Sequence, residues 1–309
     1  MRPSLNGFYL VDKPRGLTST AVLNRIKSLL KKWLENAGIR EKIKVGHSGT
    51  LDPFSTGLLV ILVGKATRLS EYIINYEKEY MGTMVLGRLT DTLDPEGTVL
   101  KEEDASYVLK KDVERVAREL SGKEIELEVP RFSAVKKNGV RLYELAREGK
   151  EVEVPRRKVF IYEFEVTDFV RDIHPLVAFR AVVGRGVYLR SLANYFASRL
   201  GTVGMLESLR RTRIGDFTIE EALPLEEFEV DLMDKFLLPM ERLLSRYPVV
   251  NIKDARDFFK LRNGASLYLR SLFPDDIPQD TTVAVKFENK LVAVGLVQKD
   301  KVRPVKVLI

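Results

Sequence analysis

Residues 45–57 read Val-Gly-His-Ser-Gly-Thr-Leu-Asp-Pro-Phe-Ser-Thr-Gly, and the rest of the chain can be arranged around this stretch. The segment before it is helical and basic in pattern, and the segment after it, residues 58–63, is entirely apolar. Its glycines permit positive φ angles and close backbone approach. Polar loops held between regular elements are where binding and catalytic residues tend to lie. This loop is therefore the first candidate for a functional site.

Asp52 is the one carboxylate of this loop, and two interpretations of it are open. Pro53 follows it, which favours extended geometry at Asp52 and pre-sets a turn or a helix start. Asp52 would then cap a short helix beginning at Pro53. Alternatively its carboxylate takes part in chemistry. The local pattern alone favours the cap.

Several common kinds of site do not fit the loop. Gly64-Lys65 is followed by Ala66 where a phosphate-binding Walker loop needs Ser or Thr. The chain has no Cys and only two His, His47 and His174, so a zinc site is not expected. No Gly-x-Ser-x-Gly elbow accompanies a serine nucleophile. What remains is a carboxylate near a histidine, without a metal or cofactor motif.

The bulk composition predicts a globular chain of about two domains, since it has 309 residues. No stretch of eighteen uncharged apolar residues and no apolar signal-peptide core occur, so we expect a soluble, unexported, cytoplasmic protein. The formal net charge is +7, and residues 131–158 hold nine Lys or Arg against four Asp or Glu. A second basic cluster comprises Arg210, Arg211 and Arg213. Concentrated positive charge is typical of nucleic-acid binding.

Hydrophobic periodicity and turn signals predict alternating strands and helices. Strands are expected at 7–11, 58–64, 78–86, 125–129, 159–166 and 176–183, and helices after Thr18, at 66–76, at 111–120, at 141–148 and at the segment opened by residues 184–190. Asp91 and Asp94 lack calcium-loop spacing and are interpreted as solvated turn residues. Beyond Arg246 a short helix at 254–262 and strands at 282–287, 291–298 and 302–308 suit a small β-barrel. We expect domains at 1–245 and 246–309.

Residues 46–57 resemble the signature of the bacterial tRNA pseudouridine-55 synthases, the TruB family. Residues 11–14, 80–94, 184–190 and 208–211 resemble further motifs of that family, so the resemblance covers about residues 7–215. The Lys13-Pro14 turn is interpreted as structural. The last sixty or so residues resemble a PUA domain, an RNA-binding appendage, with fewer motifs.

The resemblance implies a fold and a reaction. The fold would be α+β, with a mixed, largely antiparallel sheet flanked by helices (the pseudouridine synthase fold) and a small C-terminal PUA-like β-barrel. The reaction would isomerise uridine-55 in the TΨC loop of tRNA to pseudouridine after base flipping, with no cofactor and no metal. The expected partner is tRNA, bound at the TΨC stem-loop and the acceptor end by a monomer with no obligate protein partner and no membrane.

The resemblance also implies roles for particular residues. Asp52 would be the catalytic residue, acting as nucleophile or as base, and Tyr80 would stack on the target base. Tyr188 would lie beneath Asp52, Arg190 would pair with it, Leu209 would pack against the bound base, and His47 would fill space left by the extruded nucleotide or contact displaced bases. A basic insertion at about 123–158, with Lys136, Lys137 and Arg141, would clasp the RNA.

Two alternative functions fit parts of the sequence. A non-catalytic tRNA-binding module or chaperone would account for the basic insertion and the C-terminal barrel. It would not account for the coincidence of Asp52, Tyr80, Tyr188 and Arg190. A related synthase acting on ribosomal RNA within a larger complex would share the catalytic motifs. The short C-terminus, without a charged tail, argues against that alternative.

Overall fold

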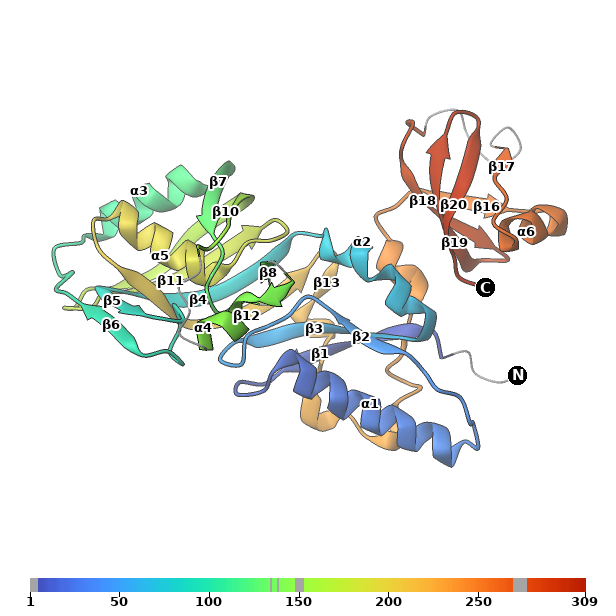
Figure 1. The fold of residues 1–309 in the computed structure, drawn as a ribbon, viewed down its shortest axis with the longest axis horizontal. Helices are drawn as coiled ribbons and strands as arrows, with labels where there is room; N and C mark the ends of the chain where they lie inside the picture. Colours follow the sequence, from blue (N-terminus) through green and yellow to red (C-terminus); the bar gives the residue numbers. More distant parts are fainter. Residues whose placement is uncertain (1–4, 134, 138, 148–152, 269–276) are drawn as a thin grey trace.

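A large mixed sheet forms the main body of the chain (Figure 1). The computed structural model describes residues 5–133, 135–137, 139–147, 153–268 and 277–309. The main path of the sheet runs in the order β14–β1–β3–β12–β4–β11–β10–β7. These strands are β1 (Gly7–Lys13), β3 (Thr56–Val63), β4 (Lys78–Leu86), β7 (Lys123–Glu128), β10 (Arg156–Val170), β11 (Leu176–Val183), β12 (Gly204–Ile214) and β14 (Leu223–Pro224). β2 (Val45–Ser48), β13 (Phe217–Thr218) and β15 (Leu238–Pro239) pair at its sides.

Three helices cover the sheet because each presents one apolar stripe to it. α1 (Ser19–Asn36) starts where the Thr18 hydroxyl accepts a hydrogen bond from the Ala21 amide, and its buried side packs on β1 and β3. α3 (Lys110–Leu120) and α5 (Leu189–Arg199) pack on the β4–β11–β10–β7 part of the sheet (Figure 1). The α+β class predicted from the sequence is confirmed.

β12 joins the two halves of the sheet. It runs antiparallel to β4 and parallel to β3, with Arg210 opposite Thr56 and Arg211 opposite Gly57. A Cβ on Gly57, whose φ is +103°, would lie 2.3 Å from the Arg211 carbonyl oxygen. Only glycine allows the strands to approach this closely. The pairing brings the segment after residue 204 beside the loop that precedes β3.

The C-terminal residues form a five-stranded sheet in the order β16–β18–β19–β20–β17, beside α6 (Ala255–Arg262). The strands are β16 (Val249–Ile252), β17 (Leu267–Tyr268), β18 (Thr282–Phe287), β19 (Lys290–Gln298) and β20 (Lys301–Val307). Leu291 and Leu308 share an apolar cluster with Phe8 of β1. Lys306 pairs with Glu71 at 2.6 Å, so this sheet also docks through charge. The boundary at residue 246 stays a prediction.

A chain of ion pairs crosses the exposed side of the main sheet. Arg180 of β11 pairs with Glu79 of β4 at 2.6 Å. Arg246 pairs with Glu77 at 2.8 Å. The chain is completed by Arg213, which pairs with Glu77 at 3.0 Å and Glu79 at 3.8 Å. These contacts tie β11, β4 and β12 to Arg246, which precedes the first strand of the C-terminal sheet, β16.

Most of the elements that the sequence predicted lie where it predicted them, with two differences, while the central strand β12 was not predicted. The helix expected at 66–76 is a 3₁₀ segment (Gly64–Leu69) followed by the short α2 (Ser70–Ile74). The Thr67 hydroxyl donates to the Gly64 carbonyl at 2.8 Å, which favours the tighter turn. No helix begins at Pro53, where the chain makes a turn before β3. Among the described residues, no helix is long and apolar enough to cross a bilayer.

Candidate active site

The loop that carries Asp52, residues 49–55, connects β2 to β3. The Ser55 amide donates to the Asp52 carbonyl at 3.1 Å, which closes a turn rather than a helix. The capping interpretation of Asp52 is therefore wrong, because there is no helix for its side chain to cap. Asp52 instead lines a cavity, and its side chain is 36% exposed.

The backbone of this loop is held by buried side chains from elsewhere. The Ser19 hydroxyl, at the start of α1, accepts from the Leu51 amide at 2.8 Å and donates to the Leu51 carbonyl at 3.0 Å. Lys13, fully buried, donates to the Pro53 carbonyl at 3.3 Å and to the Leu17 carbonyl at 2.6 Å. Groups held by buried hydrogen bonds are fixed in position, which suits a residue that must meet a reacting atom.

Arg211 of β12 holds the backbone on both sides of the same loop. Its side chain is 1% exposed and donates to the Leu58 carbonyl at 2.8 Å and to the Gly49 carbonyl at 3.3 Å. The two acceptors lie on either side of Asp52 in the chain. The guanidinium also lies 6.0 Å from the ring centre of Tyr80. One side chain thus touches both the loop of Asp52 and the expected stacking residue.

Asp52 forms an ion pair with Arg190, the first-turn arginine of α5. Arg190 Nε lies 3.0 Å from Asp52 Oδ2, and its Nη1 lies 3.3 Å from Asp94 Oδ2. The guanidinium also donates to the carbonyls of Thr92 at 2.8 Å and Phe132 at 2.9 Å. Arg190 is therefore a fixed, buried cation shared by two carboxylates.

The charge state of Asp52 depends on opposing effects. Burial raises the pKa of its carboxyl above the ordinary value, and Arg190 opposes that rise. Asp94 raises the same pKa and Lys13 lowers it. Burial also lowers the pKa of Lys13 to about 8, although Asp52 and Glu96 raise it. Since desolvation disfavours the charged form, Arg190 and Lys13 offset part of the effect of burial on the Asp52 pKa.

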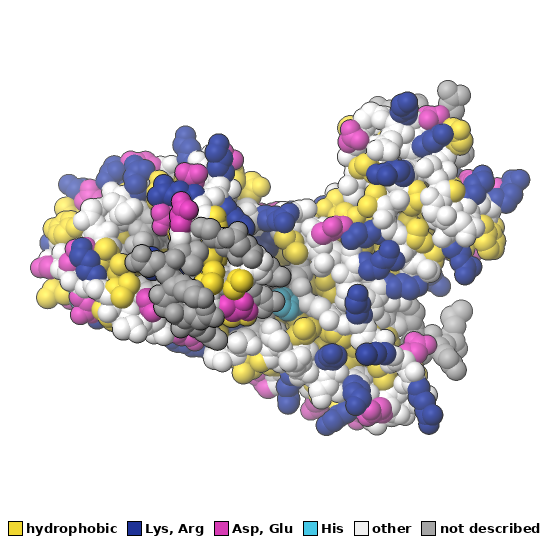
Figure 2. Space-filling model, viewed as in Figure 1, with side chains coloured by type: hydrophobic (Ala, Val, Ile, Leu, Met, Phe, Trp, Pro, Cys, Tyr) yellow, Lys and Arg dark blue, Asp and Glu magenta, His cyan; other side chains and the backbone are white. Residues whose placement is uncertain are grey.

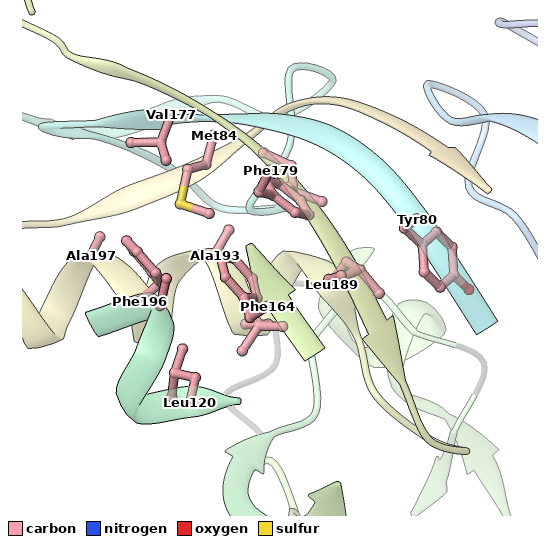
Figure 3. Close-up of a cluster of buried hydrophobic side chains, with 14 of the residues drawn as sticks. Tyr80, Met84, Leu120, Phe164, Val177, Phe179, Leu189, Ala193, Phe196 and Ala197 are labelled. Carbon is pink, nitrogen blue, oxygen red and sulfur yellow. The ribbon is translucent and has the colours of Figure 1, made fainter. Parts of the chain in front are cut away.

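A cavity of about 570 Å³ brings five of the expected site residues together: Asp52, Tyr80, Tyr188, Arg190 and Leu209. They come from the 49–55 loop, β4, the residue before α5, α5 and β12. Tyr80 and Leu209 are 7% and 8% exposed and belong to the apolar cluster beneath α5. Figure 3 shows Tyr80 at the end of this cluster, beyond Leu189. The cavity thus has an apolar, aromatic wall and a paired carboxylate.

His47 is not among the residues that line this cavity. It lies on β2 opposite Ile61, and burial together with Arg211 lowers the pKa of its imidazole.

Lys136 and Arg141 are paired residues of β8 (Lys136–Lys137) and β9 (Val140–Arg141), followed by α4 (Leu142–Arg147). The side chains of Lys136, Lys137 and Arg141 lie outside the described residues, so their contact with RNA stays a prediction.

The second basic cluster is not a patch of unpaired cations. Arg210 pairs with Asp12 at 2.6 Å and Arg213 with Glu77 at 3.0 Å, while Arg211 is buried. Alternation along β12 explains this, because neighbouring residues of a strand point to opposite faces. Charge can be read from a sequence, whereas the partners that neutralise or bury it depend on the fold.

Three residues of the site were missed or misread in the sequence: Lys13, Asp94 and Arg211. Asp94 is not a solvated turn residue, since its side chain is 4% exposed and accepts from the Thr92 hydroxyl at 2.6 Å. Lys13 is more than a turn residue, because its ammonium supports the Pro53 carbonyl and influences Asp52. Their positions inside matched motifs were the available signal.

Comparison with known proteins gives consistent matches. Residues 35–189 match the family described as TruB family pseudouridylate synthase (N terminal domain). The chain is 37% identical to tRNA pseudouridine synthase B of Clostridium tetani over 307 residues, covering 99% of this chain and 100% of that protein. It is 40% identical to the enzyme of the same name from Caldicellulosiruptor saccharolyticus, covering 80% of this chain and 79% of that protein.

Two solved structures are similar to this chain over almost its whole length. A Cbf5-Nop10-Gar1 complex matches with a TM-score of 0.74 and 28% identity over 99% of this chain and 85% of that chain. An H/ACA RNP bound to a substrate RNA containing 2′-deoxyuridine matches with a TM-score of 0.72 and 26% identity, over 98% and 85% of the two chains.

Proposed function

The chain belongs to the TruB family of pseudouridylate synthases, and on that premise we infer that it is a tRNA pseudouridine synthase, an isomerase. We propose that its target is uridine-55 in the TΨC loop. The relatives that support the tRNA substrate match over almost their whole length, so the inference covers both parts of the chain.

The proposed reaction begins with extrusion of the target nucleotide. A stacked base cannot present its glycosidic bond to a carboxylate, so it must be flipped into the cavity at a cost of about a few kcal/mol. Tyr80 offers an aromatic face on which the flipped base can stack, which is worth roughly 1–3 kcal/mol. Leu209 supplies an apolar contact on the same wall. The cavity therefore offsets part of the cost of flipping.

Asp52 then acts on the ribose. Its carboxylate either attacks C1′ as a nucleophile or removes the C2′ proton as a general base, and both routes break the bond between C1′ and N1. The detached uracil rotates and rejoins C1′ through C5. In the first route this displaces the Asp52 carboxylate from C1′, and in the second the proton held by Asp52 returns to C2′. C5 then loses its proton and N1 gains one, so the product has the same atoms as the substrate. Both routes need Asp52 ionised, which is the role we propose for Arg190.

The observation that carries this proposal is the ion pair between Asp52 and Arg190 inside a cavity lined by Tyr80. The test is to replace Asp52 by Asn or Ala and to map pseudouridine in tRNA transcript. Isomerisation should be abolished while tRNA affinity stays within a few-fold, because phosphate contacts dominate binding. Asp168→Asn, an exposed position on β10, is the matched control. Substantial turnover by Asp52→Ala would refute the assignment.

We also propose that the protein acts as a monomer without a protein partner, in the cytoplasm where tRNA is found, and that the C-terminal sheet contacts the acceptor end. A ribosomal RNA synthase working within a complex is less well supported, since the named tRNA enzymes match at higher identity than Cbf5. Activity of the purified chain on free tRNA transcript would separate the two. Activity only with added protein partners would favour the complex.

A further inference from the structure

Another basic surface lies on α1 and on the segment that follows it, residues 37–44. We call it the α1 basic surface and define it by Arg25, Lys27, Lys31, Lys32, Arg40, Lys42 and Lys44. All seven are exposed. The same twenty positions, 25–44, contain two acidic residues, Glu35 and Glu41, so the local charge is +5. Figure 2 shows dark-blue side chains gathered over the part of the molecule labelled α1 in Figure 1.

These cations are largely free of intramolecular partners. Within the described residues, the ion pairs of this surface are limited to Lys31 with Glu35 at 3.5 Å, and both of those side chains are more than half exposed. An exposed pair of this kind contributes little. The arginines of the ion-pair chain differ, since Arg180, Arg213 and Arg246 are each held by two or more carboxylates. The α1 basic surface therefore remains available to an external polyanion.

The surface is hollowed where α1 ends. A groove of about 630 Å³ runs between the C-terminal half of α1 and residues 38–45. Four cations (Lys27, Lys31, Arg40 and Lys42), two carboxylates (Glu35 and Glu41) and several apolar side chains line it, so the charged lining has an excess of cations. Cations that line two sides of a low-dielectric groove concentrate positive potential within it. An excess of cations in such a groove favours a polyanion, such as a line of phosphates.

The position of the groove suits RNA that extends from the active site. The first turn of α1 is fixed to the catalytic loop through Ser19 and Leu51. A helix of 18 residues is about 27 Å long, so the groove begins some way along it from the cavity. At the other end, the Lys44 carbonyl accepts from the Gly64 amide at 2.8 Å. Arg68 of the adjoining 3₁₀ segment donates to the Val307 carbonyl, so basic residues continue towards the C-terminal sheet.

We propose that the α1 basic surface binds the sugar–phosphate backbone of the tRNA outside the stem-loop that is held at the active site. The inference rests on the proposed function, which supplies the RNA. The α1 basic surface would add a contact to full tRNA that the isolated stem-loop cannot make. Binding of this kind is independent of sequence and falls with salt, because each neutralised phosphate releases counterions.

The test is the quadruple variant K27Q/K31Q/R40Q/K42Q, compared with K110Q/K111Q/R115Q/R118Q on α3. The two variants lose the same charge from exposed positions. Affinity is measured over a range of salt for full tRNA and for the isolated TΨC stem-loop, with single-turnover pseudouridine formation on both. For full tRNA we expect the α1 variant to bind at least about tenfold more weakly, with a log–log salt slope lower by about 0.9 for each phosphate that it no longer neutralises. Its affinity and turnover on the stem-loop should match the wild type.

Three results would overturn the proposal. An equal loss of affinity in the α3 variant would mean that net charge alone is responsible. An equal loss on the stem-loop would place the surface at the active site, and unchanged tRNA affinity would leave RNA out of this groove and point to a different partner. If the wild type made no pseudouridine but bound full tRNA more tightly than the α1 variant by the expected factor, the proposed function would be refuted. The binding surface would still be supported.

Discussion

Arg190 is the residue on which the charge of Asp52 depends most directly. It is buried, it pairs with Asp52 at 3.0 Å, and it is also held by Asp94 and by two backbone carbonyls. Its planar guanidinium can serve all of these acceptors at once, which an ammonium cannot. The pair is therefore built for one charge state and one orientation of the carboxylate.

Replacing Arg190 should reduce turnover and change its dependence on pH. Arg190→Ala should lower kcat by about tenfold or more, since each unit by which the Asp52 pKa rises above the assay pH lowers the ionised fraction about tenfold. Arg190 lowers the pKa of Asp52, so its removal raises that pKa further. Residual activity should then rise with pH as Asp52 ionises. Arg190→Lys should keep RNA affinity and recover part of kcat.

The measurement is a single-turnover pH profile of Arg190→Ala beside the wild type, with RNA affinity recorded separately. Arg199→Ala, at an exposed ion pair at the other end of α5, is the control. A loss of activity that is confined to KM and does not vary with pH would assign Arg190 to the RNA backbone instead.

Arg211 should act through the backbone of the catalytic loop. Arg211→Met leaves the Gly49 and Leu58 carbonyls without their donor, at a cost of about 1–3 kcal/mol for each buried group. We expect kcat to fall by about tenfold or more while tRNA affinity changes little, and Arg211→Lys to restore part of kcat. Because Arg211 lowers the pKa of His47, that pKa should rise in Arg211→Met.

His47 and His174 are the two histidines of the chain, so NMR titration can follow each imidazole separately. Arg210→Met, which removes a neighbouring charge paired with Asp12, is the control and should leave His47 unchanged. If Arg211→Met retained full kcat with a shifted His47 pKa, Arg211 would be close to the loop but not needed to position it.

At the scale of elements, the basic insertion between β7 and β10 is the segment whose role still rests on resemblance. The β8–β9 hairpin is present, with Lys136 opposite Arg141. The Phe132 carbonyl at its base accepts from Arg190 at 2.9 Å. A conformational change of this segment on RNA binding would therefore alter the contacts of Arg190, which pairs with Asp52.

Neutralising Lys136, Lys137 and Arg141 together by Gln should raise KM for the stem-loop and flatten its salt dependence, by about 0.9 in log–log slope for each phosphate that is no longer neutralised. The α3 variant K110Q/K111Q/R118Q is the control. A normal salt slope in a folded triple variant would show that these side chains lie away from the RNA.

The sequence predicted elements better than it predicted partners. Apolar periodicity located β4, β11 and α3 closely because these patterns are local. Resemblance selected Asp52, Tyr80 and Arg190, which share one cavity. Lys13 and Asp94 were taken for turn residues, since burial of a charge depends on contacts from distant segments. Arg211 donates to Leu58 across 153 positions, and no local pattern encodes that hydrogen bond.

At the scale of the whole molecule, the C-terminal sheet is not a simple appendage. Leu291 and Leu308 pack in one apolar cluster with Phe8 of β1. Deleting residues 246–309 would expose that cluster and reduce stability as well as RNA binding. Point changes where the two parts meet are therefore a cleaner test than truncation.

Arg246 offers such a change. It pairs with Glu77 at 2.8 Å and Asp216 at 2.7 Å, and it is the last member of the ion-pair chain across the sheet. Arg246→Met should lower Tm by a few degrees, since about 1 kcal/mol corresponds to roughly 2–4 °C for a chain of this size. The decrease in Tm should shrink in about 1 M salt, where such pairs are screened. Calorimetry with Arg256→Met, at an exposed pair, as control would check it; an equal decrease in both variants would contradict it.

The position of β12 in the sheet has a consequence for how the chain reaches its native state. β12 lies between β3 and β4 but is made more than a hundred residues after them. Until it arrives, β4 lacks its partner along one edge and β3 lacks its partner at residues 56–57. Open edges invite pairing with other chains. Contacts between distant segments also form slowly. Arg211, which lies on β12, must be synthesised before it can hold the catalytic loop. The nascent protein should therefore pass through a long inactive stage in which its own strands need protection from aggregation.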